Sequence, residues 1–112
     1  MPYGISWLCN ENKQEIIYTD KIIPLPLQDN SGIALIKSPF SKEDSQAYII
    51  NPHGDICFDI GESIRKNERD AIMSDVYYIF NDLFFFFNVN GCDYRIQVEP
   101  KVGIVGEVIL SY

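Results

Sequence analysis

The dipeptide Asn90-Gly91 lies between two segments in which large apolar side chains recur at every second position. A two-residue type I′ turn needs φ > 0 at both loop positions, and Asn followed by Gly satisfies this requirement best. Such a turn fixes the pairing of its flanking strands, so we expect Phe85 opposite Ile96 and Phe86 opposite Arg95. A slip of one residue would move every apolar side chain to the other face. The turn and the apolar pattern therefore predict the same antiparallel hairpin.

This register sorts the side chains into two faces. The first is apolar and contains the pairs Leu83/Val98, Phe85/Ile96, Phe87/Tyr94 and Val89/Cys92. The second carries Phe84 and Phe86 beside Arg95, and a cation–π contact between Arg95 and Phe86 would contribute about 0.5–1 kcal/mol. Two interpretations stay open. Either the N-terminal strands or the segment 61–75 cover the two rings, or the rings form a contact site for another protein, with Arg95 and Glu107 as its polar rim.

The sheet is expected to extend on both sides of this hairpin. An upstream turn at Asn81-Asp82 would place Phe80 opposite Leu83 and Tyr78 opposite Phe85. Downstream, a loop over Glu99–Gly103 would return the chain along the same strand. The expected pairs there are Ile96/Gly106, Tyr94/Val108, Cys92/Leu110 and Arg95/Glu107.

The N-terminal half contains further short extended segments. Strands are expected over 4–8 and 15–19 around a polar linker over 9–14, then over 22–28 and over 33–37, before a polar loop over 38–45. Pro24 and Pro26 have no N–H group to donate to a neighbouring strand. The segment 22–28 is therefore expected to be an edge strand or a broken one.

A second hairpin is expected over Ala47–Ile60. The tetrapeptide Asn51-Pro52-His53-Gly54 has the residue preferences of a type I turn, with Gly54 as a left-handed bulge residue. This turn predicts Ile50 opposite Ile56 and Tyr48 opposite Phe58, with all four side chains on one core face. Gly61–Asp75 is the one segment predicted to contain a helix, near 62–74, and its sparse apolar residues leave a charged loop as the alternative.

These segments together predict a mainly β fold in a single domain over residues 1–112. We expect antiparallel meander sheets, sandwich-like or resembling part of a propeller, with one short helix near 62–74.

The chain is acidic, with sixteen Asp and Glu against nine Lys and Arg and a net charge of −7. This charge disfavours nucleic acid and anionic membranes as partners and favours a basic protein. The N-terminus has neither a basic region nor a long apolar segment, and no apolar run approaches the ~20 residues of a membrane span. Three cysteines in no metal-binding spacing predict free thiols and no zinc. Together these features predict a cytoplasmic protein.

No catalytic constellation is evident. The only histidine, His53, lies in a turn, and Cys57 is expected to pair with Ile49 in the adjacent strand. A Cys57–His53 dyad is thus a minor alternative, and no phosphate-binding or metal-binding motif is present. We therefore predict that the protein is not an enzyme and binds no cofactor.

Two segments resemble the outer hairpins of β-propeller blades. Tyr48–Ile60 and Tyr94–Ile109 each consist of an alternating strand, a turn with Pro and Gly, and a second alternating strand. A blade takes about 40–45 residues, so a chain of this length does not supply a ring of four blades. The resemblance implies an open fragment at most.

As a type, the chain resembles the immunity proteins of bacterial contact-dependent inhibition and related polymorphic toxin systems. The shared features are its length, its net charge of −7, its many aromatic residues and its lack of a catalytic constellation. The resemblance implies a cytoplasmic protein that binds and neutralises a co-encoded toxin domain, often a basic nuclease. It also implies that carboxylates mimic nucleic-acid phosphates or cover the toxin's active site, and it assigns no individual residues.

Candidate contact residues follow from position along the chain. The acids near turns or strand ends are Asp55, Asp59, Glu62, Asp70, Asp82 and Asp93. The alternative patch consists of Phe84, Phe86 and Arg95. This patch would also suit a second hypothesis, a small adaptor module that binds a ligand or a protein in a groove beside the aromatic face.

Overall fold

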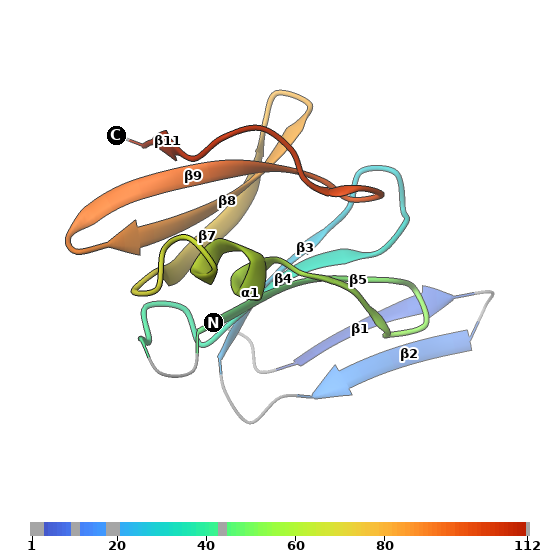
Figure 1. Ribbon diagram of the computed structural model, residues 1–112. Helices are drawn as coiled ribbons and strands as arrows, with labels where there is room; N and C mark the ends of the chain where they lie inside the picture. The colour runs from blue at the N-terminus through green and yellow to red at the C-terminus, as the bar shows by residue number, and fades with distance from the viewer. Residues whose placement is uncertain (1–3, 10–11, 18–20, 43–44, 112) are drawn as a thin grey trace.

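The computed structural model describes residues 4–9, 12–17, 21–42 and 45–111, the first two ranges as backbone only (Figure 1). The elements in chain order are β1 (Gly4–Cys9), β2 (Asn12–Ile17), β3 (Ile22–Pro26), β4 (Ile33–Lys37), β5 (Gln46–Ile50), β6 (Ile56–Asp59), α1 (Ile60–Arg65), β7 (Ile72–Ile79), β8 (Asp82–Val89), β9 (Cys92–Glu99), β10 (Gly103–Ile104) and β11 (Ile109–Leu110). The prediction of a mainly β protein with one short helix is confirmed.

The strands form two larger antiparallel sheets and a separate hairpin of β1 and β2. One sheet has the order β3-β4-β5-β6, and the other has the order β10-β9-β8-β7 with β11 also paired to β9. Apart from the pairing of β11 with β9, every pairing joins strands that follow one another in the chain. The predicted meander is therefore confirmed, and the described strands close no barrel.

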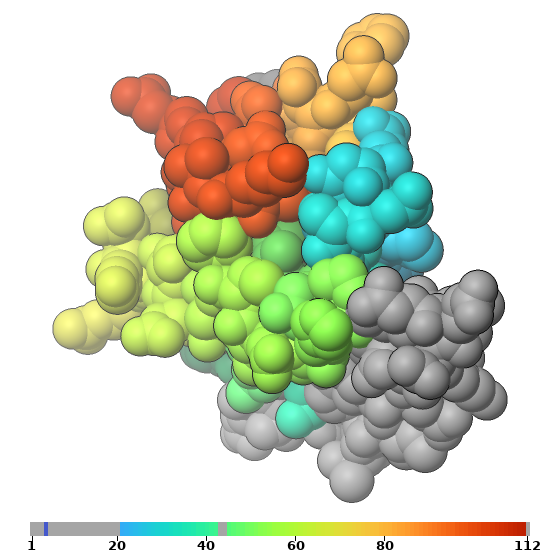
Figure 2. All heavy atoms as spheres, turned by 90° about the vertical axis from the view of Figure 1, so that its right-hand side faces the viewer, coloured from blue at the N-terminus to red at the C-terminus, as the bar shows by residue number. Residues whose placement is uncertain are grey.

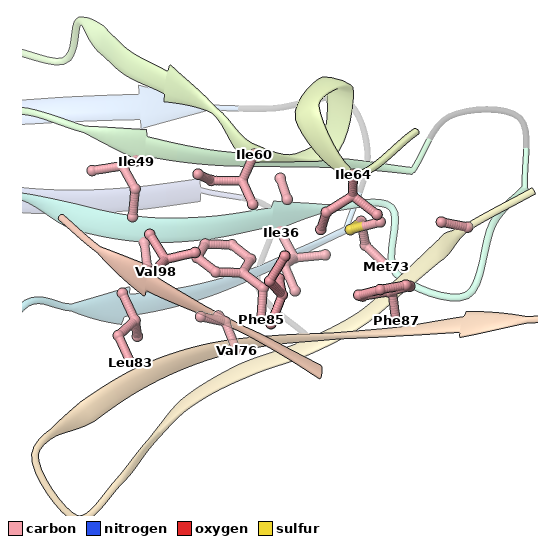
Figure 3. Close-up of a cluster of buried hydrophobic side chains, with 14 of the residues drawn as sticks. Ile36, Ile49, Ile60, Ile64, Met73, Val76, Leu83, Phe85, Phe87 and Val98 are labelled. Atoms are coloured by element: carbon pink, nitrogen blue, oxygen red, sulfur yellow. The ribbon is translucent and has the colours of Figure 1, made fainter. Parts of the chain in front are cut away.

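The hydrophobic core lies between the two larger sheets (Figure 3). Phe85 and Phe87 of β8 point into it and are fully buried. From the opposite sheet Ile36 and Ile49 pack toward them, and Ile64 of α1 covers one end. Burying a Phe or Ile side chain contributes about 1.5–3 kcal/mol each, so this layer holds the sheets together.

The β8–β9 hairpin has the predicted register at every pair, from Leu83 opposite Val98 to Val89 opposite Cys92. Asn90 and Gly91 have φ angles of 52° and 87°, both in the left-handed region that the turn requires. Figure 3 shows Phe85 and Phe87 on the core side of the sheet, as the register demands.

The β7–β8 turn is displaced from its predicted position. Its loop residues are Phe80 and Asn81, and Tyr78 lies opposite Leu83 and Tyr77 opposite Phe84. Phe80 has a φ of 57°, a conformation that side-chain preferences assign to Asn, Asp or Gly. Tyr77, Tyr78 and Ile79 thus each lie opposite a β8 residue two positions before the predicted partner, and the predicted pairs Phe80/Leu83 and Tyr78/Phe85 are wrong. A shift of two positions keeps Tyr77, Tyr78 and Ile79 on their predicted faces.

The final strand is also displaced, because it is interrupted. Glu99 pairs with Gly103 and Val98 with Ile104, as the predicted register requires, but beyond Ile104 the chain leaves the ladder and returns as β11. Arg95 consequently lies opposite Ile109 and Tyr94 opposite Leu110. The predicted pairs Arg95/Glu107, Tyr94/Val108 and Cys92/Leu110 are therefore wrong, and Ile96/Gly106 does not form because β10 ends at Ile104.

In the β5–β6 hairpin the turn is as predicted and the ladder differs. Ile50 lies opposite Ile56, but Phe58 lies opposite Ile49, not Tyr48. A bulge at Cys57 adds an unpaired residue to β6, which also overturns the predicted Cys57/Ile49 pair. The β5 residues in the core cluster are Ala47 and Ile49, and Phe58 packs against that cluster. The predicted core face is therefore wrong for Tyr48, Ile50 and Ile56, and Ile56 is exposed.

The N-terminal predictions are confirmed with different boundaries. β1 and β2 form a hairpin, but they extend to Cys9 and begin at Asn12, so the linker is shorter than expected. Residues 18 and 19 of the predicted second strand lie outside the described residues. β3, with its two prolines, is an edge strand of its sheet, as predicted.

The helix is shorter than predicted and begins earlier. Asp59 is its N-cap, and its carboxylate accepts the N–H of Glu62 at 2.9 Å. Residues 72–74, predicted to end the helix, belong to β7 instead. Met73 and Val76 reach the core from this strand, and pairing with β8 removes the segment from the helix.

Candidate functional site

One face of the larger C-terminal sheet is turned away from the core. This outer face is formed by Asp75 and Tyr77 of β7, Phe84 and Phe86 of β8, and Asp93 and Arg95 of β9. Side chains alternate between the faces of a sheet, so Phe85 and Phe87 point inward while their neighbours point outward.

Side chains of its own sheet shield the outer-face rings. The Tyr77 ring stacks on Phe86 with centroids 4.2 Å apart, and the Arg95 guanidinium carbon lies 5.3 Å from the centre of the Phe84 ring. Phe84 is 9% exposed and Phe86 is 7% exposed. The expected Arg95 contact with Phe86 is therefore wrong, because Tyr77 occupies that ring. Among the described residues, the side chains in contact with these rings include Tyr77 of β7 and Arg95 of β9, which lie outside the two segments that the sequence suggested.

A hollow of about 340 Å³ lies beside Phe86 at one end of the outer face. We call it the Phe40 hollow, and its lining residues are Phe40, Ser74, Asp75, Tyr77, Phe86, Asp93 and Ser111. A smaller hollow of about 200 Å³ adjoins it and shares Phe40, Ser74 and Asp93. The hollow thus combines aromatic rings, two carboxylates and two serines.

The loop between β4 and β5 places Phe40 at the wall of this hollow. The Phe40 N–H donates to the Met73 carbonyl at 3.0 Å, and the Met73 N–H donates to the buried Ser45 hydroxyl at 2.9 Å. The loop therefore substitutes for a neighbouring strand at the start of β7. Phe40 is 69% exposed and has a φ of 67°, a strained region for an aromatic residue. The fold holds an exposed ring at this position against its backbone preference.

Local hydrogen bonds hold both carboxylates of the hollow. The Val76 N–H donates a hydrogen bond to Asp75 Oδ1 at 2.8 Å, and Asn88 Nδ2 donates one to Asp93 Oδ1 at 3.0 Å. The Asp93 carbonyl also accepts the N–H of Ser111 at 2.8 Å. Neither carboxylate forms a salt bridge within the described part of the chain. Each therefore keeps an oxygen that can accept further hydrogen bonds.

The structure does not gather the predicted acids in one patch. Asp55 lies in the β5–β6 turn, while Asp59 and Glu62 lie at the start of α1. Asp70 forms an exposed salt bridge with Lys42 at 3.5 Å. Of the predicted contacts, only Asp93 and Phe86 line the Phe40 hollow, with Phe84 and Arg95 next to them.

Asp82 belongs to a different acidic region at the opposite end of β8. There the β3–β4 loop, the β7–β8 turn and the β9–β10 turn lie together (Figure 2). Asp29, Asp82 and Glu99 border a hollow of about 150 Å³ at this end. The side chain of Ser31, together with its backbone N–H, lowers the pKa of Asp29 by hydrogen bonding to the carboxylate. Among the described residues no group of His, Cys, Asp and Glu has a metal-binding arrangement.

Five residues of the Phe40 hollow are absent from the sequence-based candidates: Phe40, Ser74, Asp75, Tyr77 and Ser111. Asp75 ends the segment 61–75 that is predicted to contain the helix. In a helix, the spacing of two residues between Asp75 and Tyr77 does not place them on one face. A strand beginning at Ile72 would have placed both on one face. Phe40 carried no comparable signal, because its position depends on a contact between the β4–β5 loop and β7.

The described part of the chain contains no helix with the length and apolar character needed to cross a membrane. No family model matches the sequence, and the searches of curated proteins and of solved structures give no significant match either.

Proposed function

We propose that this chain is an immunity protein, a stoichiometric inhibitor in the bacterial cytoplasm that binds and neutralises a co-encoded toxin domain, a basic nuclease. The observation that carries this proposal is the Phe40 hollow. Exposed aromatic residues lie there beside Asp75 and Asp93, on a chain with a net charge of −7.

The aromatic part of the hollow has the chemistry of a protein contact. Aromatic residues dominate the energetic centres of interfaces, where truncation of one to alanine often costs ~2 kcal/mol or more. Phe40 is 69% exposed and Tyr77 is 43% exposed. An exposed ring held in a strained backbone conformation gains little for folding, which favours a role in binding.

The charge of the chain supports a basic partner. An acidic protein attracts a basic one over distances of about the Debye length, ~10 Å at 0.1 M salt, and this attraction raises the association rate. In this proposal Asp93 contacts the partner in the hollow. Asp55, Asp59, Glu62, Asp70 and Asp82 contribute to the field from other parts of the surface. No nucleic acid and no membrane take part.

The proposal is tested by titrating the purified protein against the C-terminal toxin domain encoded next to its gene, with toxin activity and calorimetry as readouts. We expect a one-to-one complex, loss of toxin activity and weaker binding at high salt. Tyr77→Ala should weaken binding about thirtyfold, as expected for a central aromatic contact. Phe80→Ala is the matched control, because Phe80 is an exposed ring at the other end of β7. The absence of binding at micromolar concentration would contradict the proposal.

The size of the Phe40 hollow favours one alternative, a small adaptor module that binds a ligand or a peptide. Ligand pockets begin at roughly 300 Å³, and the hollow has about 340 Å³. An adaptor of this kind would lose binding in Phe40→Ala and Phe84→Ala variants and tolerate charge reversal of the surface acids. An inhibitor of a basic toxin would lose affinity on charge reversal and depend strongly on salt.

A further inference from the structure

The Phe40 hollow combines two kinds of group that bind organic cations. Ring faces attract a guanidinium or ammonium group within about 6 Å of the ring centre, and carboxylates accept its hydrogen bonds. Phe40 and Tyr77 supply exposed ring surface, while Asp75 and Asp93 supply the acceptors. The two kinds of group line the same hollow.

No described cation of this chain neutralises the hollow. Arg95 is the positively charged residue among those named on the outer face. Its guanidinium lies over Phe84, and Phe84 is paired with Gln97. The guanidinium therefore extends along β9 in the direction away from Asp93. Lys42, in the loop that carries Phe40, lies 3.5 Å from Asp70. Asp75 and Asp93 therefore line the hollow with hydrogen-bond partners but without a salt bridge to a described cation.

The geometry points to a specific occupant, and we propose that the hollow receives an arginine side chain of the partner protein. The planar guanidinium stacks on aromatic rings and donates in a fork to carboxylates, which an ammonium group cannot do. A volume of about 340 Å³ lies at the lower end of the range for ligand pockets and accommodates one long side chain. That the arginine belongs to a partner protein rests on the proposed function. That the hollow binds a guanidinium group rests only on the residues that line it.

A probe that carries only the side-chain chemistry tests the hollow directly. We would titrate n-butylguanidinium chloride into the ¹⁵N-labelled protein and follow amide shifts by NMR, with n-butylammonium and n-butanol as comparisons. The expected result is a saturable shift at Tyr77, Asp75 and Asp93, at lower concentration for the guanidinium than for the ammonium. No localised shift with either cation would overturn the proposal, and tighter binding of the ammonium would overturn the assignment to arginine.

Conservative variants separate charge from local structure. Asp75→Asn and Asp93→Asn keep an oxygen that accepts from Val76 and Asn88, respectively, so the backbone should stay in place. We expect the double variant to bind the guanidinium about tenfold more weakly, since charge-assisted bonds are about twice as strong as neutral ones. Asp82→Asn, at the other acidic end, is the control and should bind as the unmodified protein does. Equal weakening by Asp82→Asn would mean that general surface charge explains the binding.

The two proposals fail in distinguishable ways. If the probe saturates the hollow and the toxin stays active, the cation site stands and the proposed function is wrong. If the toxin is neutralised equally by the protein and by the Asp75→Asn/Asp93→Asn variant, and the probe causes no localised shift, the proposed function stands and the arginine site is wrong.

Discussion

Strand β8 has two aromatic faces that differ in what covers them. Phe85 and Phe87 point inward and are fully buried between the two larger sheets, where side chains from β4, β5 and α1 surround them. Phe84 and Phe86 point outward, and their neighbours are Tyr77 and Arg95 from the same sheet. The inner rings stay buried as long as the two sheets are packed together. The outer rings stay buried only while the neighbouring side chains keep their present rotamers. The outer face can therefore rearrange on contact with a partner while the inner face cannot.

Phe85→Ala should have the largest effect on stability. The ring lies within a close-packed layer that relaxes only partly, so its removal should lower the free energy of unfolding by about 3–5 kcal/mol. Denaturation by urea, followed by circular dichroism, measures this loss. Phe87→Ala serves as a second inner-face variant and should lose a similar amount. A loss below 1.5 kcal/mol at both positions would erase the proposed difference between the faces.

Phe84→Ala should lower the free energy of unfolding by less, about 1.5–3 kcal/mol. This is the free energy of burying the ring, without the added cost of a cavity that cannot relax. The Arg95 side chain lies over the Phe84 ring and can move into the space that the ring leaves. The same urea experiment measures the change. A loss equal to that of Phe85→Ala would show that the outer rings are held as rigidly as the inner ones.

Phe40→Gly and Phe80→Gly form a pair that separates folding from binding. Both residues are exposed phenylalanines with φ angles of 67° and 57°, a region that glycine adopts without strain. Each variant should raise the free energy of unfolding by about 0.5–1 kcal/mol. The substitution relieves backbone strain in the folded state, and this gain exceeds the stability lost because glycine makes the unfolded chain more flexible. In a titration with the toxin domain, only Phe40→Gly should weaken binding. Equal binding by both variants would remove Phe40 from the contact.

The contact between Arg95 and Phe84 should give the smallest effect. A double-mutant cycle with Arg95→Met and Phe84→Leu should yield a coupling energy of about 0.5–1 kcal/mol in urea denaturation. Methionine keeps the aliphatic length of Arg95 and removes its charge. A coupling energy near zero would show that Arg95 covers the ring without attracting it.

Much of the fold follows from sequence because local turn chemistry determines pairing. Asn90-Gly91 specifies the whole β8–β9 register, since few other residue pairs adopt its φ angles. The errors lie where tertiary contacts override these preferences. Phe80 occupies a loop position that propensity assigns to Asn, because the core requires Val76 opposite Phe85. The bulge at Cys57 and the break before β11 also have no clear signature in the sequence.

The candidate site was less predictable than the fold. Alternation along β8 and β9 placed Phe86 and Asp93 on one face, because a strand repeats every two residues. Phe40 comes from a loop thirty-five residues before Asp75, and hydrogen bonds of Met73 with Phe40 and Ser45 join this loop to β7. No periodicity encodes a contact of this kind.

The meander has a consequence for how quickly the protein reaches its native state. The pairings among β3–β6 and among β7–β10 all join strands that follow one another in the chain. Hairpins of this kind form in about 1–10 μs, because the entropy lost on closing a short loop is small. The slow step should then be the docking of two preformed sheets across α1, when Ile60 and Ile64 meet the inner face of β8. The rate-limiting contact would therefore lie at the short helix, and substitutions at Ile64 should slow folding more than substitutions in any hairpin turn.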